Sequence, residues 1–189
     1  FWIDTFSHSL IESYCGIISF IIAYVVYREY KSSGKRSNLF LFLAFFSMGV
    51  FDFFHAYSNY CVTLFVWFHS LSAFSGGAYF LWSAVSVKSR TKDQQWLRHV
   101  FILSGITITM VSAVAISSFP SFLPGAVMID ISHHTPVTFP IRGEFTDHLV
   151  VVNIVSAFFF SLAGVYYLRY FNASNDFLYH IFALSAFLF

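Results

Sequence analysis

Charged residues are scarce in this chain. Lys, Arg, Asp and Glu make up 10% of its 189 residues, whereas a soluble globular domain carries about 25%. So few charges cannot cover the surface of a soluble protein. The sequence also has no broad basic patch, so we do not expect nucleic acid as a partner. Cysteine is rare too: Cys15 and Cys61 are the only two, and without a CxxC pair they indicate neither a disulfide framework nor a redox module.

Hydrophobic residues dominate instead, at 58% of the sequence. A helix needs about 20 apolar residues to cross a hydrocarbon core of about 30 Å. The apolar runs do not alternate in polarity as the strands of a membrane barrel do. They predict an all-α polytopic transmembrane bundle in a lipid bilayer, a single domain over residues 1–189 with five complete spans and a truncated sixth. The runs are residues 6–27, 39–57, 62–87, 96–119, 148–171 and 177–189.

The basic residues predict the orientation of these spans, because Lys and Arg concentrate in short cytoplasmic loops. All but Arg142 fall on one side of the predicted bundle, which places the N-terminus outside and loops 28–38 and 88–98 in the cytoplasm. The sixth span would then run outward and stop inside the bilayer. The residues on the cytoplasmic side are Arg28, Lys31, Lys35, Arg36, Lys88, Arg90, Lys92, Arg98 and Arg169.

The segment 120–147 differs from the spans, because it carries Pro120, Pro124, Pro136 and Pro140. Prolines at this density exclude a regular transmembrane helix. We expect an extracytoplasmic proline-rich loop, either a lid or a re-entrant segment over the helix ends.

Ionisable residues inside the spans are costly, at about 2.5–3.5 kcal/mol each, so each one requires a reason. His8 and Glu12 are four residues apart in the first span, and Asp52 and His55 are three apart in the second. Both spacings place the two groups on one face of a helix. His69 lies about two turns into the third span.

A further pair, Glu144 and His148, opens the fifth span. With the predicted orientation, the groups in the first, second, third and fifth spans all lie near the outer leaflet. His99 and His180 belong to the cytoplasmic side. We therefore expect one shared site, although each pair alone also fits a structural hydrogen bond, and Glu144 also fits a helix cap.

Imidazoles beside carboxylates suit Zn²⁺, Cu²⁺ or Fe. The same groups also suit a proton sensor, because histidine changes charge between about pH 5 and 8, or the polar end of a pocket for a small ligand. We assign the candidate metal ligands to His8, His55, His69 and His148, and other ligand contacts to Glu12, Asp52, Trp67 and Glu144.

Two motifs carry a resemblance. The segment 6–12 (FSHSLIE), followed by an apolar span, and the segment 49–55 (GVFDFFH) resemble the third MASE type of membrane-associated sensor domain. The resemblance extends to His8, Glu12, Asp52 and His55. Residues 56–60 (AYSNY) depart from the family's usual continuation, and His69 stands near the place of an expected arginine.

The resemblance implies the input domain of a signal-transduction protein of the bacterial inner membrane. Its output would be a histidine kinase, as in two-component systems, or a diguanylate cyclase, and it would act as a homodimer. The fragment itself is expected to be non-catalytic, with the output domain beyond its C-terminal end. The alternative is an enzyme, an intramembrane zinc-dependent hydrolase of the alkaline ceramidase kind. A transporter or channel is disfavoured, because the inner halves of the spans carry few ionisable residues.

Overall fold

The computed structural model of the chain describes residues 5–58, 62–87, 95–119, 123, 147–174 and 177–188. These residues form six helices and no β-strand, which confirms the all-α fold. The helices are α1 (Thr5–Ser33), α2 (Arg36–Tyr57), α3 (Val62–Val85), α4 (Gln95–Ser118), α5 (Asp147–Ser174) and α6 (Phe177–Leu188).

Five of these helices are long and apolar enough to cross a membrane, as the sequence predicts. Their apolar stretches are Ser7–Ser33, Arg36–Tyr57, Thr63–Val85, His99–Ser118 and Asp147–Ala173. The helix α6 begins at Phe177, where the sixth apolar run begins, and covers 12 residues.

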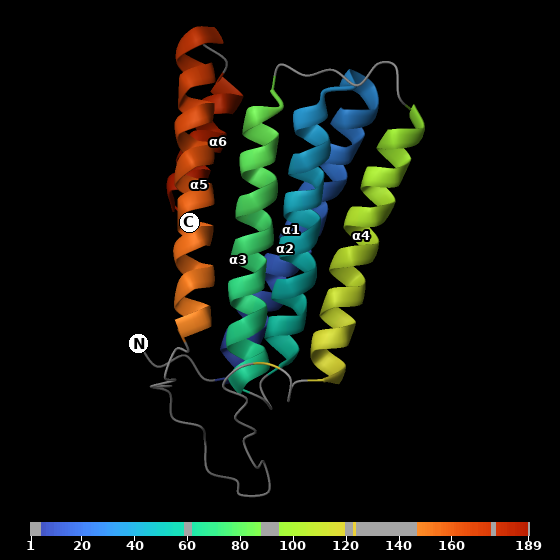
Figure 1. Cartoon of the computed structure of the whole chain (residues 1–189), viewed down its shortest axis with the longest axis vertical. Helices are drawn as coiled ribbons and strands as arrows, with labels where there is room; N and C mark the ends of the chain where they lie inside the picture. Colours follow the sequence, from blue (N-terminus) through green and yellow to red (C-terminus); the bar gives the residue numbers. More distant parts are fainter. Residues whose placement is uncertain are drawn as a thin grey trace, which may run out of the picture.

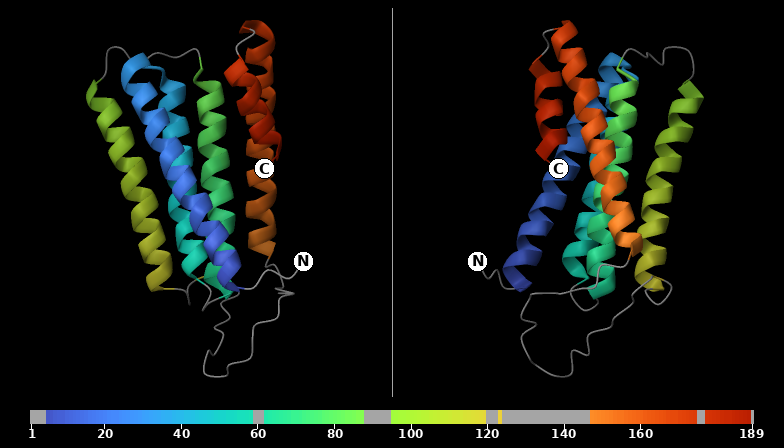
Figure 2. Two further views of the ribbon diagram at one scale, coloured as in Figure 1. Left: turned by 180° about the vertical axis from the view of Figure 1, so that it is seen from behind. Right: turned by 60° about the vertical axis from the view of Figure 1, so that its left-hand side comes forward.

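The helices lie roughly parallel or antiparallel to one long axis (Figure 1). The most buried of the five long helices is α2, because α1 and α3 pack on it and α4 contacts it from the edge of the bundle. On the other side, α5 packs on α3 and α6 packs on α5 (Figure 2). The helix α2 is therefore the centre of the bundle.

Small side chains allow this close packing. Ala44, Ala84 and Ala163 are fully buried among the aromatic residues of α2, α3 and α5. A Cβ atom at Gly77 would lie 3.1 Å from the ring of Phe160, so α3 and α5 approach as closely as a glycine permits. Such contacts are typical of membrane helices, which associate through tight packing of small residues.

The bundle has two chemically different ends. At one end α1, α3 and α5 begin and α2 ends; we call this the histidine end, because it holds His8 and His55 (Figure 1). At the other, α1 ends and α2 begins through a turn with Lys31, Lys35 and Arg36; we call this the basic end. The proline-rich segment 120–147 lies outside the described residues, apart from Leu123, which packs on a core cluster of α2, α3 and α4, and Asp147, which begins α5.

Candidate functional site

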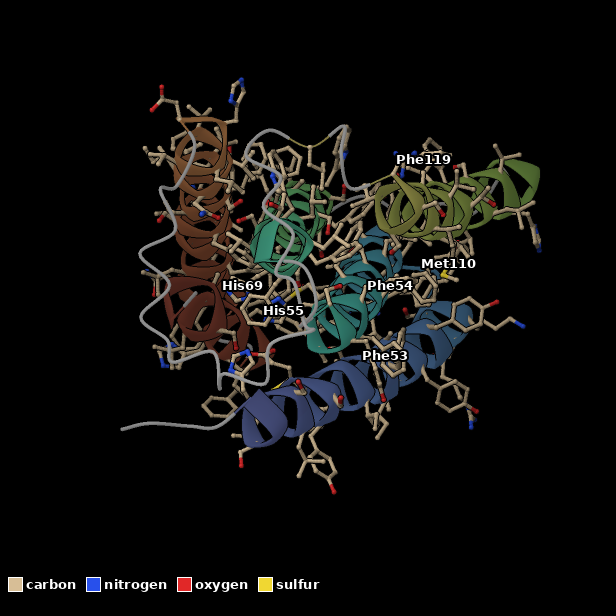
Figure 3. All side chains as sticks on the ribbon, turned by 90° about the horizontal axis from the view of Figure 1, so that it is seen from below. Phe53, Phe54, His55, His69, Met110 and Phe119 are labelled. Carbon is tan, nitrogen blue, oxygen red and sulfur yellow. The ribbon has the colours of Figure 1, made fainter. Side chains whose placement is uncertain are left out.

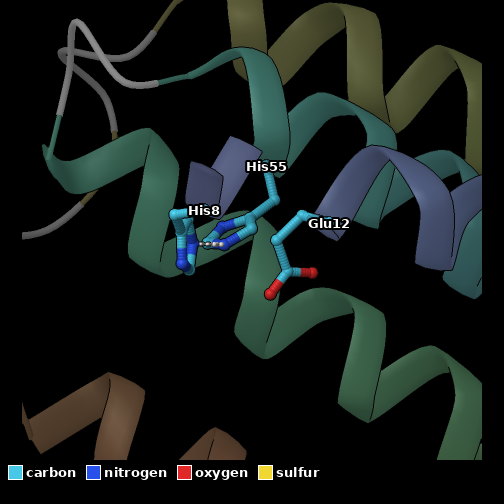
Figure 4. A group of neighbouring side chains, drawn as sticks. All are labelled: His8, Glu12 and His55. Atoms are coloured by element: carbon cyan, nitrogen blue, oxygen red, sulfur yellow. Dashed lines mark hydrogen bonds between the residues drawn. The ribbon is translucent and has the colours of Figure 1, made fainter. Parts of the chain in front are cut away.

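Three ionisable side chains meet at the histidine end, where α1 and α2 lie side by side. His8 and Glu12 are one turn apart on α1, and His55 comes from the last turn of α2. His8 and Glu12 are half-buried, while His55 is only 2% exposed. Figure 4 shows the two imidazoles and the carboxylate turned toward one another.

The geometry of these groups suits a metal ion. One donor atom from each residue can be chosen so that all three lie within 4.8 Å of one another. The Nε2 atoms of His8 and His55 are 3.4 Å apart. Two imidazole nitrogens bound to a tetrahedral Zn²⁺ at about 2.0–2.1 Å would be about 3.3 Å apart. The two histidines therefore already have nearly the separation that one bound ion requires.

The orientation of the buried imidazole is fixed by the neighbouring helix. The Nδ1 atom of His55 lies 2.6 Å from the carbonyl oxygen of Phe65 on α3. A carbonyl oxygen only accepts hydrogen bonds, so Nδ1 carries the proton and the Nε2 of the neutral ring keeps its lone pair. The ring also packs on Phe65, with 3.9 Å between centroids. A hydrogen bond of this kind typically holds a histidine in the tautomer and orientation needed to ligate a metal.

Two glycines explain why α1 and α2 come close enough to form the group. Gly16 lies one turn from Glu12 on α1, and Gly49 lies about one turn before Asp52 on α2. A Cβ atom at Gly16 would be 3.3 Å from the carbonyl oxygen of Gly49, and one at Gly49 would be 3.2 Å from that of Gly16. The backbones of α1 and α2 therefore cross in contact about two turns from the histidines.

Asp52 lies beside the group on α2. Its carboxylate is hydrogen-bonded to the side chain of Ser72 on α3 and interacts electrostatically with Glu12 and His69. The Ser72 hydroxyl has a single proton, and its other acceptor within reach is the carbonyl oxygen of Met48, at 3.5 Å. Asp52 is thus a carboxylate near Glu12 and His69, in contact with α3 through Ser72.

His69 is also close to the group. Its ring centroid is 5.3 Å from that of His55, although its nitrogens do not belong to the set within 4.8 Å. Its side chain is exposed. Viewed along the helices from the histidine end, His55 and His69 lie next to each other (Figure 3).

The other predicted site residues do not join this group in the described part of the chain. Trp67 is two residues from Phe65, about 200° around α3 at 100° per residue, so it lies on the opposite face of the helix. His148 is exposed in the first turn of α5, and Glu144 lies outside the described residues. His99 and His180, near the starts of α4 and α6, belong to the basic end, which agrees with their exclusion from the site (Figure 1).

Sequence reasoning missed two contributors to this site. The carbonyl oxygen of Phe65 is a backbone group, so no residue type could have revealed it. Ser72 is three residues after His69 and shares its face of α3, but a serine in an apolar helix more commonly bonds its own backbone, as Ser75 bonds Leu71 here.

The arrangement offers two imidazoles and a carboxylate as ligands, with a second carboxylate nearby. Such donors suit Zn²⁺ or another first-row transition ion. Without a metal, the Nε2 of His8 is placed to donate a hydrogen bond to the lone pair of His55.

No known protein family, curated protein or solved structure matches this chain, so the resemblance to the membrane-associated sensor domain stays a prediction.

Proposed function

We propose that this chain is a membrane-integrated sensory input domain that detects a transition-metal ion at the site formed by His8, Glu12 and His55. The observation that carries the proposal is the meeting of three donor atoms from two helices within 4.8 Å. The hydrogen bond from His55 to the carbonyl of Phe65 supports it, because that bond leaves the lone pair of His55 on Nε2, the nitrogen that faces His8.

The charge distribution supports an outward-facing site. Lys31, Lys35 and Arg36 lie at the basic end, away from the histidines. Because such residues favour the cytoplasmic side, the histidine end would face the outside of a bacterial inner membrane. The input would then come from the extracytoplasmic medium or the outer leaflet.

Metal binding at this site would directly affect how the helices are arranged. The ligands come from α1 and α2, and the second nitrogen of His55 is held by α3. An ion that is bound by both α1 and α2 favours whichever arrangement brings its ligands together, and a ligand shifts a conformational equilibrium by that difference in affinity. The relative positions of α1 and α2 would thereby depend on whether the site holds an ion.

The resemblance to the third MASE type supports a signalling role. The residues that carry it, His8, Glu12, Asp52 and His55, come from motifs about 40 residues apart and meet at one place in the fold. Under this proposal the output is a histidine kinase or a diguanylate cyclase, acting as a homodimer.

The test is the metal content of the purified chain. Wild-type protein, loaded with Zn²⁺ and freed of excess metal, should retain about one ion per chain by elemental analysis. His8→Ala and His55→Ala should each retain far less, since loss of a ligand from a three-residue set leaves only two. His148→Ala is the matched control, because that exposed histidine lies at the same end of the bundle but outside the group.

Wild-type protein that retains no Zn²⁺, Cu²⁺ or Fe would overturn the proposal. Equal retention in wild type and both alanine variants would do the same. Folding of each variant is checked by helix content and by its elution as a single species in detergent.

One observation favours a second function, a zinc-dependent hydrolase within the membrane. Two histidines and a glutamate are the ligands of several catalytic zinc sites, which keep a fourth position for water. Asp52, next to Glu12, is placed to assist such a water. Turnover of a lipid amide or ester by the zinc-loaded chain, lost in Asp52→Asn with metal retained, would support the enzyme over the sensor.

A further inference from the structure

We infer that His69 supplies a fourth ligand, so that the bound ion is enclosed by three imidazoles and one carboxylate from three helices. This inference rests on the proposed metal site and names its coordination. It selects Zn²⁺, which prefers four nitrogen, sulfur or oxygen ligands at the corners of a tetrahedron.

The face of α3 that meets the site carries the inference. Phe65, His69 and Ser72 are spaced by four and three residues, so they line one side of the helix. The carbonyl of Phe65 holds His55, and the side chain of Ser72 holds Asp52. His69 lies between these two anchors on α3, and its imidazole lies beside that of His55.

The distance that His69 must travel is short. Its ring centroid is already 5.3 Å from that of His55. Its side chain is exposed, so a change between staggered rotamers displaces no packed core. His55, in contrast, is buried and held at both ring nitrogens. The buried histidine provides a fixed ligand, and His69 closes on the ion that it holds.

The charges also fit an enclosed ion. Zn²⁺ with three neutral imidazoles and the Glu12 carboxylate has a net charge of +1. Asp52, which interacts electrostatically with both Glu12 and His69, supplies one further negative charge. The whole set is then neutral, as a site between apolar helices requires, since an uncompensated charge there is costly.

A fourth protein ligand on the ion would distinguish a sensor from an enzyme. A four-ligand zinc site leaves no position for a reactive water and is typical of structural sites, whereas catalytic sites keep one position open. An ion bound by α1, α2 and α3 together also joins the three helices more firmly than one bound by α1 and α2 alone. The inference therefore favours the sensor.

The experiment replaces zinc with Co²⁺ in the full chain and records its visible absorption. Four-coordinate Co²⁺ absorbs much more strongly than five- or six-coordinate Co²⁺. Wild type should give the strong four-coordinate spectrum. His69→Ala should give the weaker spectrum of an ion that has gained water, and should bind Zn²⁺ about 100-fold more weakly, a loss at the upper limit for residues that only support a ligand. His148→Ala should match wild type in both measurements.

The outcomes separate this inference from the proposed function. A wild-type chain that binds neither Zn²⁺ nor Co²⁺ overturns the metal site itself. If the wild type binds both ions and His69→Ala gives the same Co²⁺ spectrum as the wild type, only the role of His69 as a ligand is overturned. His69→Cys, which keeps a zinc-binding side chain at this position, should restore four-coordinate binding and shows that the alanine variant has not merely misfolded.

Discussion

The two ends of the bundle both contain polar groups buried between helices, but they use them differently. Near the basic end, the Tyr167 hydroxyl donates to Ser83 Oγ at 2.7 Å, and Ser83 donates to the carbonyl of Ser37 at 2.7 Å. This chain of hydrogen bonds joins α5, α3 and α2. At the histidine end, His55 Nδ1 donates to the Phe65 carbonyl at 2.6 Å, and the Nε2 atoms of His55 and His8 lie 3.4 Å apart.

The difference separates a structural contact from a binding site. In the Tyr167 chain both hydroxyl protons are used and the last acceptor is a backbone carbonyl, so nothing is left for a ligand. Tyr167 and Ser83 are fully buried. The atoms of His8, Glu12 and His55 that can bind a metal instead face one another, and two of these three residues are only half-buried. Fully hydrogen-bonded groups hold helices together, whereas two imidazoles and a carboxylate that converge from two helices can also bind a cation.

The largest expected effect comes from separating α1 from α2 without touching a ligand. Gly16→Leu would place a side chain against the carbonyl of Gly49, which a Cβ alone approaches to 3.3 Å. We expect Zn²⁺ affinity to fall at least about 100-fold, or about 2.8 kcal/mol, measured by competition with a chelator. Ile17→Leu, at an exposed position of the same helix, should bind as wild type does. Normal affinity in Gly16→Leu would show that the site does not depend on this crossing.

The next effect should fall on stability alone. Ser83→Ala leaves the buried Tyr167 hydroxyl without its acceptor, so we expect a loss of about 1–2 kcal/mol in the free energy of unfolding. Tyr167→Phe removes the donor itself and should cost less, about 0.6 kcal/mol. Denaturant unfolding in detergent gives both values. Zn²⁺ affinity should stay unchanged in each variant; a large drop would mean that the two ends are coupled.

At Asp52 we expect a smaller loss of Zn²⁺ affinity than in Gly16→Leu. Asp52→Asn keeps the size of the side chain but removes the negative charge beside Glu12 and His69. Zn²⁺ affinity should fall about tenfold, the lower end for groups that support metal ligands. Ser72→Ala, which removes the hydrogen bond to the Asp52 carboxylate, should have a weaker effect in the same direction. A loss as great as that of His55→Ala would make Asp52 a ligand.

Much of the fold follows from the sequence because apolar runs are a strong signal. The predicted span 39–57 lies within α2 (Arg36–Tyr57), and the run that starts at residue 177 starts α6. The length of α2 is the length that a helix needs to cross a hydrocarbon core. Which helices touch was not predictable in this way, since lipid-facing and helix-facing residues are equally apolar. Exposed Val100 and buried Leu39 illustrate this.

The candidate site was predictable only in part. Helical spacing correctly paired His8 with Glu12. Because successive spans run in opposite directions, the end of the second span, with His55, was correctly expected at the same end of the bundle. The spacing could not show that His148 stays apart, because its distance depends on how α5 packs against α3. It also could not show which ring nitrogen of His55 carries the proton, which depends on a backbone carbonyl of another helix.

The glycine contact between α1 and α2 divides α1 into two unequal arms. At the helical rise of about 1.5 Å per residue, the arm from Gly16 to His8 is about 12 Å long and the arm from Gly16 to Ser33 is about 26 Å long. A rigid rotation about this fulcrum moves the far tip about twice as far as the tip that holds the histidine. An ångström gained or lost between His8 and His55 then becomes about two ångströms at the turn that joins α1 to α2, at the opposite end of the bundle.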